Sequence, residues 1–195
     1  VMTGRPVTIP WAAEHVPAIL QAWHGGIRTG RAVADILSGA VNPSGKLSVS
    51  FPRTVGQIPV YYAHKNTGRP ALGAGTTQFT DPFRSTWIDE TNDPLYPFGY
   101  GLSYTCFAYE LLTVKTPKVK RGDTLKVSAM LSNTGARAGV EIVQLYVRDL
   151  VGSVTRPVKE LKGFQRVALA PGESREVVFE VPVESLGFHG LDNQW

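Results

Sequence analysis

The chain has 195 residues and a formal net charge of +4 at pH 7; 43% of its residues are hydrophobic and 18% are charged. This length suits one large domain or two small ones, and the composition is that of a folded globular protein. Lys and Arg residues are scattered, so the charge does not predict a nucleic-acid partner. No apolar run approaches the length needed to cross a bilayer, so no membrane partner is predicted either.

Cysteine and histidine predict neither a metal site nor a cofactor. Cys106 is the only cysteine, which excludes an intrachain disulfide and a Cys-rich zinc site. Its neighbours are apolar, so we expect a small buried side chain rather than a nucleophile. His15, His24 and His189 lie too far apart in the sequence to suggest a metal site, and no carboxylate joins them at ligand spacing.

The first part of the chain, residues 1–103, has the pattern of an α/β segment. Residues 7–9 are typical of the end of a strand. A helix is predicted from Pro17 to about residue 23, since proline suits the first helical position. Apolar side chains recur there at the helical spacings of three and four residues, namely at Val16, Ile19, Leu20 and Trp23.

A second helix and a strand follow. The helix is predicted over residues 29–38, with Thr29 as its N-cap and Gly39 just after its end. Alternation of apolar and polar residues over 47–51 is typical of a half-buried strand. Residues 52–97 then hold six prolines and no regular period, which predicts a long loop. Loops of this length inside a compact domain are uncommon and often functional.

The last part of the chain, residues 104–195, changes to an all-β pattern. Alternating residues and Gly-, Pro- or Asn-containing turns predict a β-sandwich built from short strands. The predicted strands cover residues 108–115, 124–132, 140–149, 157–168 and 174–182.

Several motifs carry a family resemblance. Residues 94–104, PLYPFGYGLSY, combine four aromatics with two prolines and two glycines, and residues 42–62 read NPSGKLSVSFPRTVGQIPVYY. Together they resemble the C-terminal half of glycoside hydrolase family 3, the β-glucosidase-like enzymes. NTGARAGVEIVQLYVRD at 133–149 and RPVKELKGFQRVALAPGES at 156–174 resemble the fibronectin type III-like domain of that family.

The resemblance implies the domain organisation. Residues 1–103 are expected to be the C-terminal part of the family's α/β sandwich domain, with the long loop 52–97. Residues 104–195 are expected to form a fibronectin type III-like, immunoglobulin-like β-sandwich that lacks its last strand. The aromatic residues of the connecting stretch are expected to hold the two domains together: Tyr96, Phe98, Tyr100 and Tyr104.

The same resemblance places the catalytic residues outside this chain. Retaining glycosidases use two carboxyl groups roughly 5 Å apart, and the family's pair lies upstream of Val1. Asp89 and Glu90 are adjacent, but neighbouring side chains of an extended segment point apart. We therefore predict no catalytic residue here and no turnover by the isolated chain.

Substrate-binding residues are expected in the long loop. Aromatic faces can stack on sugars, and Arg, His and Asn donate hydrogen bonds to hydroxyls. By resemblance, Arg69 is the first candidate, followed by His64, Lys65 and Asn66. Trp87 is a further candidate for a wall of the sugar site. The alternatives are that Lys65 and Arg69 pair with acids of a neighbouring barrel domain, and that Trp87 packs between domains.

The resemblance thus implies the C-terminal part of a retaining β-glycosidase that hydrolyses terminal β-linked glucose or a related sugar. Its partners would be the N-terminal barrel and remainder of the same enzyme, together with a β-glucoside or oligosaccharide substrate. Assembly with further copies of the chain stays open. The alternative is a stand-alone carbohydrate-binding module or a structural interaction module.

Overall fold

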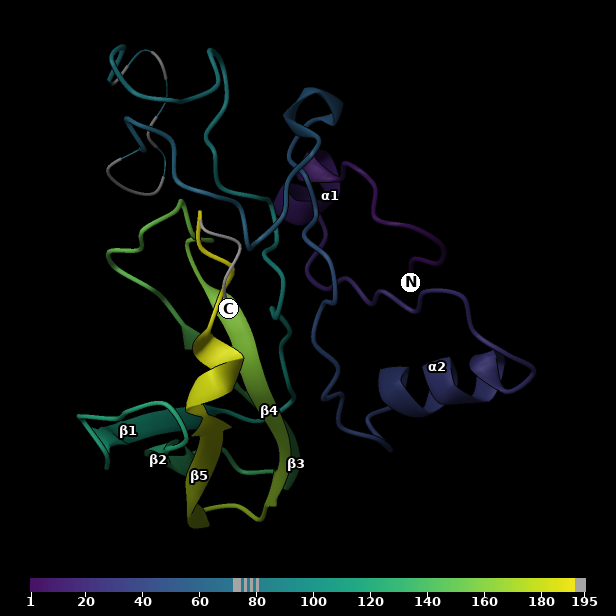
Figure 1. Ribbon diagram of the computed structural model, residues 1–195. Coiled ribbons are helices and arrows are strands. Elements are labelled where there is room, and N and C mark those ends of the chain that lie inside the picture. Colours follow the sequence, from purple (N-terminus) through teal and green to yellow (C-terminus); the bar gives the residue numbers. More distant parts are fainter. Residues whose placement is uncertain (72–74, 76, 78, 80, 192–195) are drawn as a thin grey trace. The chain divides into compact units, whose positions relative to one another are not determined.

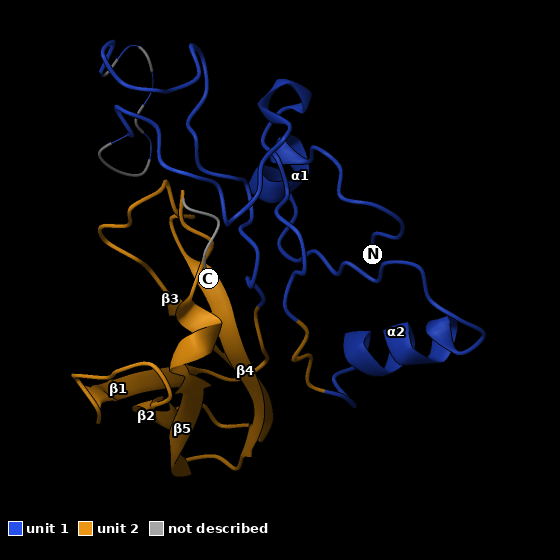
Figure 2. Ribbon diagram, viewed as in Figure 1, with its two compact units in different colours: residues 1–41, 46–101 blue, residues 42–45, 102–195 orange. Residues whose placement is uncertain are grey.

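The chain folds into two compact units, shown in Figures 1 and 2. Unit 1 comprises Val1–Val41 and Lys46–Gly101, and unit 2 comprises Asn42–Gly45 and Leu102–Trp195. The turn at Asn42–Gly45 therefore belongs with the C-terminal part of the chain. The structure, a computed structural model, describes residues 1–71, 75, 77, 79 and 81–191.

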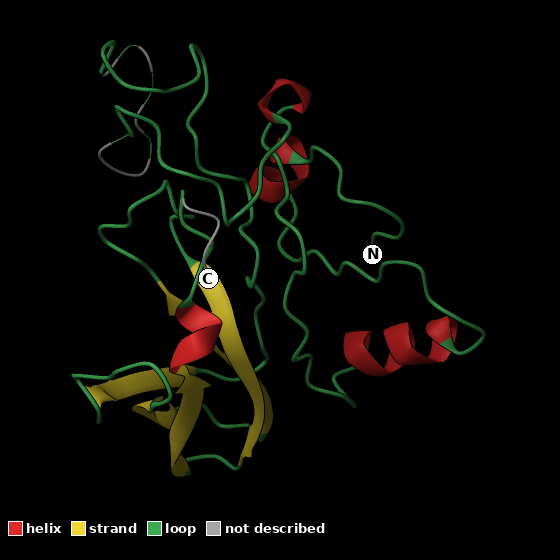
Figure 3. Cartoon of the chain, in the orientation of Figure 1, coloured by secondary structure: helices red, strands yellow, loops and turns green. Residues whose placement is uncertain are grey.

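Unit 1 contains few regular elements, as Figure 3 shows. They are helix α1 (Pro10–His15), helix α2 (Thr29–Leu37) and the 3₁₀ turn η1 (Val55–Gln57). Pro10 occupies the start of α1, where its missing N–H leaves no bond unmade. Apart from η1, the described residues of the predicted loop 52–97 form no helix or strand, and Figure 3 draws them as loop.

The helix predicted over residues 17–23 is wrong. Met2 N donates a 2.8 Å hydrogen bond to Leu20 O, and Ala22 N donates one of 2.8 Å to Met2 O. These bonds form a parallel bridge between Met2 and Gln21. Residues 20–22 therefore pair with the N-terminal segment, and this pairing overrides the helical spacing of residues 17–23.

Helix α2 confirms the second predicted helix. The helix begins at Thr29, so Arg28 and not Thr29 is the N-cap residue. The Thr29 hydroxyl donates a 2.6 Å hydrogen bond to Gly26 O instead of capping the helix. Gly39 follows the helix with a φ of 77°, the left-handed conformation that glycine adopts without steric strain.

The core of unit 1 is aromatic. Phe51 is buried, with ring centroids of Trp23 at 6.1 Å and Tyr96 at 6.3 Å. Tyr96 in turn stacks on Tyr100 at 5.3 Å. Phe51 N donates to Tyr96 O and Leu47 N to Tyr100 O, both at 2.8 Å. Tyr96 and Tyr100 of the aromatic stretch, residues 94–104, thus pack inside unit 1, while the role of this stretch between domains stays a prediction.

Residues 47–51 do not form the predicted strand. Their pairing with the aromatic stretch leaves only an isolated bridge between Phe51 and Tyr96. The expected alternation also fails, because Ser50 is buried and Val49 is exposed. The Ser50 hydroxyl accepts a 3.3 Å hydrogen bond from Phe98 N, which gives this buried polar group a partner.

The described part of unit 2, up to residue 191, is a β-sandwich of five antiparallel strands followed by a 3₁₀ turn, η2 (Val183–Leu186). One sheet has the order β1-β2-β5 and the other consists of β3 and β4. These strands confirm the predicted ones, although β4 begins three residues later than expected. They are β1 (Phe107–Val114), β2 (Thr124–Asn133), β3 (Gly139–Val147), β4 (Glu160–Leu169) and β5 (Ser174–Pro182).

The core of unit 2 lies between its two sheets. Phe107 and Phe179 pack against a cluster of buried aliphatic residues contributed by both sheets. Buried residues alternate with less buried ones over the first half of β3 and at the end of β4, as expected for strands of a sandwich. The cluster consists of Leu131, Val143, Val167, Leu169 and Val177.

Cys106 is exposed, so the prediction of a buried thiol is wrong. It directly precedes β1, in extended backbone where successive side chains point to opposite faces. Thr105 is buried and Phe107 packs against the core, so the intervening Cys106 points outward. Apolar neighbours in the sequence did not reveal this alternation.

Candidate functional site

Four of the five predicted binding residues lie on one exposed stretch of the long loop in unit 1. His64, Lys65, Asn66 and Arg69 are all exposed. His64 Nδ1 lies 3.3 Å from the carbonyl oxygen of Lys65. Among the described residues, no acidic side chain pairs with Lys65 or Arg69, so both cations are available to an external group.

Two hydrogen bonds to Ser85 bring the segments of Arg69 and Trp87 together. Ser85 N donates a 2.8 Å hydrogen bond to Arg69 O. The side chain of Asn92 donates a 2.7 Å bond to Ser85 O. Trp87, two residues after Ser85, is 41% exposed. The loop thus places the backbone of Arg69 next to the segment that carries Trp87.

A buried amide organises the base of this loop. Gln57 is only 2% exposed, and its Oε1 accepts a 2.8 Å bond from Arg53 N. Its Nε2 donates to Thr91 O at 2.9 Å and to Asp93 O at 3.0 Å. Arg53 Nε adds a 3.1 Å bond to Asp93 O. Gln57 therefore joins the two ends of the loop.

Carboxylates of the loop bind loop atoms. Asp93 Oδ2 accepts from Gly75 N at 2.9 Å and from the Thr91 hydroxyl at 3.0 Å. Glu90 Oε1 accepts a 2.8 Å bond from Thr91 N. Asp81 Oδ2 accepts a 3.0 Å bond from Arg84 Nε. These three acids therefore stabilise the loop conformation.

Two tyrosines at the start of the stretch differ in environment. Tyr62 stacks on Phe98 with ring centroids 4.3 Å apart and planes 19° apart. Tyr61 is exposed. Tyr62 is thus an anchor for the loop on the aromatic stretch, and Tyr61 is the aromatic of this pair that faces solvent.

Sequence reasoning missed the residues that hold the loop, Gln57, Ser85 and Asn92. Polar residues in a Pro-rich segment are ordinary for exposed turns, so nothing local marks Gln57 as buried. A signal lies only in the need to satisfy backbone groups of a long loop. The candidate binding residues can therefore be proposed from the sequence, whereas the residues that hold their loop cannot.

Other kinds of site are not indicated by the described residues. No group of three His, Cys, Asp or Glu side chains lies close enough to hold a metal ion in the part of the chain that is described. None of the helices described has both the length and the apolar character of a membrane span.

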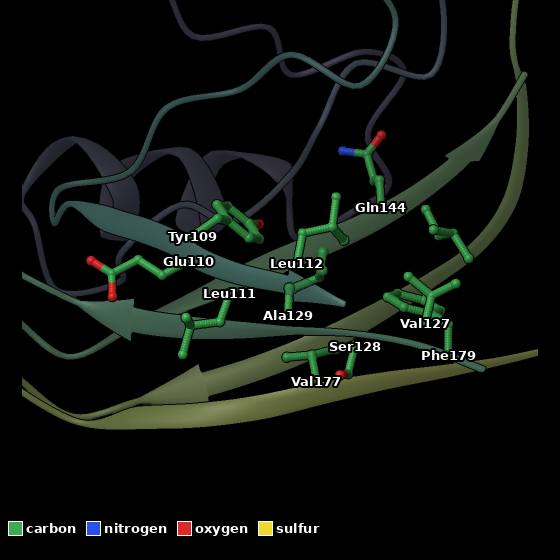
Figure 4. Close-up of a pocket in the computed structure, with 12 residues that line it drawn as sticks. Tyr109, Glu110, Leu111, Leu112, Val127, Ser128, Ala129, Gln144, Val177 and Phe179 are labelled. Carbon is green, nitrogen blue, oxygen red and sulfur yellow. The ribbon is translucent and has the colours of Figure 1, made fainter. Parts of the chain in front are cut away.

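Unit 2 contains a hollow of about 400 Å³ lined by both sheets. Tyr109, Leu111 and Leu112 of β1 are among the lining residues drawn in Figure 4. β1 bulges here, and Leu111 has a φ of 53°. The lining is mostly apolar, whereas a sugar site needs several hydrogen-bonding groups. The hollow is therefore not a candidate for the sugar site.

A tyrosine–glutamate pair lies beside this hollow. The Tyr109 hydroxyl donates a 3.1 Å hydrogen bond to Glu141 Oε1, and Glu141 is buried. Tyr109 is 49% exposed, and its partial burial, followed by the negative charge of Glu141, raises its pKa well above the usual value. The pair is distant in sequence from the loop and links β1 to β3.

Two family models match the chain. The model described as "Glycosyl hydrolase family 3 C-terminal domain" matches residues 1–104, and the model described as "Fibronectin type III-like domain" matches residues 141–195. These matches confirm the predicted fold class, an α/β segment followed by an all-β sandwich.

Relatives of known name agree with these matches. A periplasmic beta-glucosidase from Salmonella typhimurium is 46% identical over 188 residues, which cover 96% of this chain and 24% of the relative. A beta-xylosidase from Formosa agariphila is 44% identical over 193 residues, which cover 98% of this chain and 25% of the relative. The chain thus spans about a quarter of the length of the curated relatives it matches.

Solved structures give the same result. A beta-glucosidase from Listeria innocua in complex with glucose superposes with a TM-score of 0.88 at 43% identity, covering 97% of this chain and 26% of that one. Beta-glucosidase 3B from Thermotoga neapolitana, also with glucose, gives a TM-score of 0.70 at 37% identity over 93% of this chain and 25% of that one. The chain therefore belongs to glycoside hydrolase family 3, and it corresponds to the C-terminal part of such enzymes.

Proposed function

We propose that this chain is part of a retaining β-glycosidase that hydrolyses terminal β-linked glucose or a related sugar, and that it lines the substrate pocket. Relatives named beta-glucosidase and beta-xylosidase support the activity. The assignment to the pocket rests on the loop that contains Arg69. Among the described residues no acid pairs with Arg69, and the hydrogen bond from Ser85 N fixes the Arg69 backbone beside the segment of Trp87.

The loop would act through recognition of sugar hydroxyls. The Arg69 guanidinium carries five N–H donors in a rigid planar fork, which suits a pair of neighbouring hydroxyls. His64, Lys65 and Asn66 add donors on the same exposed stretch. The Trp87 indole offers a flat face for the C–H surface of a sugar ring. The two carboxyl groups of the retaining mechanism would come from the remainder of the enzyme.

The proposed partner is the rest of the same enzyme, including its N-terminal barrel. Three large apolar side chains of the loop, Phe79, Phe83 and Ile88, are exposed. Apolar side chains gathered on one segment indicate an interaction surface, since their exposure to water is unfavourable. The remaining domains would cover these side chains and place the loop over the catalytic carboxylates.

The experiment is substitution of Arg69 in the enzyme that contains this chain. Arg69→Ala should lower kcat/KM for an aryl β-glucoside by about 10- to 100-fold, the effect of losing hydrogen bonds from a charged group. Arg121→Ala, which removes an exposed arginine of unit 2, is the matched control. An unchanged kcat/KM in Arg69→Ala, with the protein folded, would overturn the pocket assignment.

One observation favours the alternative of a carbohydrate-binding module. Phe164 on β4 is 69% exposed and Tyr109 on β1 is 49% exposed, so two aromatic side chains of the sandwich reach solvent. Titration of the chain with glucans tests this alternative. Binding that is lost in Phe164→Ala but kept in Arg69→Ala would favour a module that binds sugar through the sandwich.

A further inference from the structure

We propose that Asn92 is a positioning residue for Arg69, and this inference rests on the proposed function. Asn92 is exposed, and its side chain donates a 2.7 Å hydrogen bond to Ser85 O. Ser85 uses its own N–H to donate a 2.8 Å bond to Arg69 O. Asn92 thus fixes the carbonyl group of Ser85, and the N–H group of Ser85 in turn fixes the carbonyl group of Arg69. Asn92 takes no part in the reaction itself and acts only through the hydrogen bonds that connect it to Ser85 and Ser85 to Arg69.

Asn92 can do this because both of its neighbours are fixed. The carbonyl groups of Thr91 and Asp93 both accept bonds from Gln57 Nε2, at 2.9 and 3.0 Å. Gln57 is buried, so these bonds are shielded from competing water. Because hydrogen bonds fix the residues before and after it, the backbone of Asn92 has little conformational freedom. Its side-chain amide is therefore directed at the carbonyl oxygen of Ser85.

The same neighbours hold a further part of the loop. The Asp93 carboxylate accepts a 2.9 Å bond from Gly75 N and a 3.0 Å bond from the Thr91 hydroxyl. Arg53 Nε also lies 3.8 Å from Glu90 Oε1. Hydrogen bonds and an ion pair thus hold the residues on both sides of Asn92. From this fixed segment, the exposed hydrogen bonds through Ser85 lead to Arg69.

This arrangement separates positioning from folding. Gln57 is buried and joins the ends of the loop, so its replacement would disturb folding as well as geometry. Asn92 is exposed and makes one bond to a loop carbonyl, so its removal leaves the base intact. A displaced Arg69 would weaken the binding of substrate, which raises KM, and would leave kcat nearly unchanged when ground-state and transition-state binding are affected equally.

The test is a double-mutant cycle in the enzyme that contains this chain, with an aryl β-glucoside as the substrate. Asn92→Ala should raise KM about three- to tenfold, the effect of one hydrogen bond, without a loss of thermal stability beyond that of the control Ser48→Ala, an exposed site in unit 1. In the Arg69→Ala background, Asn92→Ala should have no further effect. Asn92→Gln, which keeps an amide donor, should recover part of the loss.

The outcomes distinguish this inference from the proposed function. If Arg69→Ala raises KM and Asn92→Ala has no effect, the pocket assignment stands and the positioning role is wrong. Additive effects of the two substitutions would also overturn the positioning role, because Asn92 would then act independently of Arg69. If Arg69→Ala changes nothing, the proposed function of the loop fails, and the positioning role fails with it.

Discussion

Asn42 and Ala138 are joined by a 3.0 Å hydrogen bond across 96 positions of the sequence, from the Asn42 side-chain amide to the Ala138 carbonyl. The Oδ1 atom of Asn42 accepts two more bonds, from the Ser103 hydroxyl and from Tyr104 N, each 2.8 Å long. One amide thus connects three segments of unit 2. This explains why the turn that begins at Asn42 belongs to the sandwich unit.

Asn42→Ala should therefore destabilise unit 2. Losing the amide removes hydrogen bonds at a partly exposed site, where water can replace it, so the free energy of unfolding should fall by about 0.5–1.5 kcal/mol. Urea unfolding monitored by circular dichroism measures the change. Asn66→Ala, at an exposed amide of unit 1, is the control and should be nearly neutral. Equal stabilities for the two variants would show that the Asn42 bonds contribute nothing.

A second prediction concerns Asn133, which is 1% exposed. Its Nδ2 donates to Arg137 O at 2.8 Å and to Leu169 O at 3.2 Å, while its Oδ1 accepts from Thr105 Oγ1 at 2.7 Å. Asn133→Asp keeps the shape but places a buried carboxylate against two carbonyl oxygens. We expect a loss of about 3 kcal/mol in unfolding free energy, measured by urea unfolding against the exposed control Asn66→Asp.

A third prediction follows from the packing around Gly139. A Cβ atom at this position would lie 2.7 Å from Thr105 Cγ2, 3.0 Å from Asn42 Nδ2 and 3.1 Å from Phe107 Cζ. Gly139→Ala should lower the unfolding free energy by about 1–3 kcal/mol through overpacking. At Gly45 a Cβ would meet nothing within 4 Å, so Gly45→Ala is the control. Thermal midpoints that shift equally for both variants would contradict this account.

Much of the sandwich could be predicted because its signals are local. The alternation of Val177, Phe179 and Val181 and the turns between strands mark β5 and its neighbours without knowledge of their partners. The helix wrongly predicted from Pro17 shows the limit of local signals. There, hydrogen bonds between Met2 and residues 20–22 select an extended backbone, and helical spacing cannot reveal a partner so distant in sequence.

The candidate site shows the same division. Arg69 and Trp87 could be proposed from residue type and family resemblance, and their assignment to a sugar site stays a prediction. The support by Gln57 and Asn92 could not be predicted, because it depends on bonds that close a long loop without a period. In such a loop the three-dimensional path determines which amides are buried and which backbone groups they satisfy.

A fourth prediction concerns alkaline pH and Tyr109. Its pKa is raised in the folded chain by partial burial and by Glu141, whereas a tyrosine of the unfolded chain titrates at about 10. Below that pH both states hold the proton, so the full stability is present. Above it the unfolded chain releases the proton while the folded chain retains it, and the free energy of unfolding falls.

Tyr109→Phe should remove this part of the alkaline loss. The urea midpoint of the variant should decline less than that of the unmodified chain between about pH 9 and pH 11. Tyr61→Phe removes an exposed phenol of unit 1 and is the control, so it should keep the original slope. Parallel pH profiles for the unmodified chain and Tyr109→Phe would show that the Tyr109–Glu141 pair does not resist ionisation.

The last prediction is that the isolated chain hydrolyses no aryl β-glucoside at a rate comparable to a whole enzyme. Retaining hydrolysis needs two carboxyl groups about 5 Å apart on either side of the sugar bond. Asp81, Glu90 and Asp93 instead bind backbone and side-chain atoms of their own loop. Release of an aryl alcohol measures the rate. Mixing with the rest of the enzyme should restore turnover, and Arg69→Ala should weaken that restoration. Full turnover by the isolated chain would place the catalytic acids within these 195 residues.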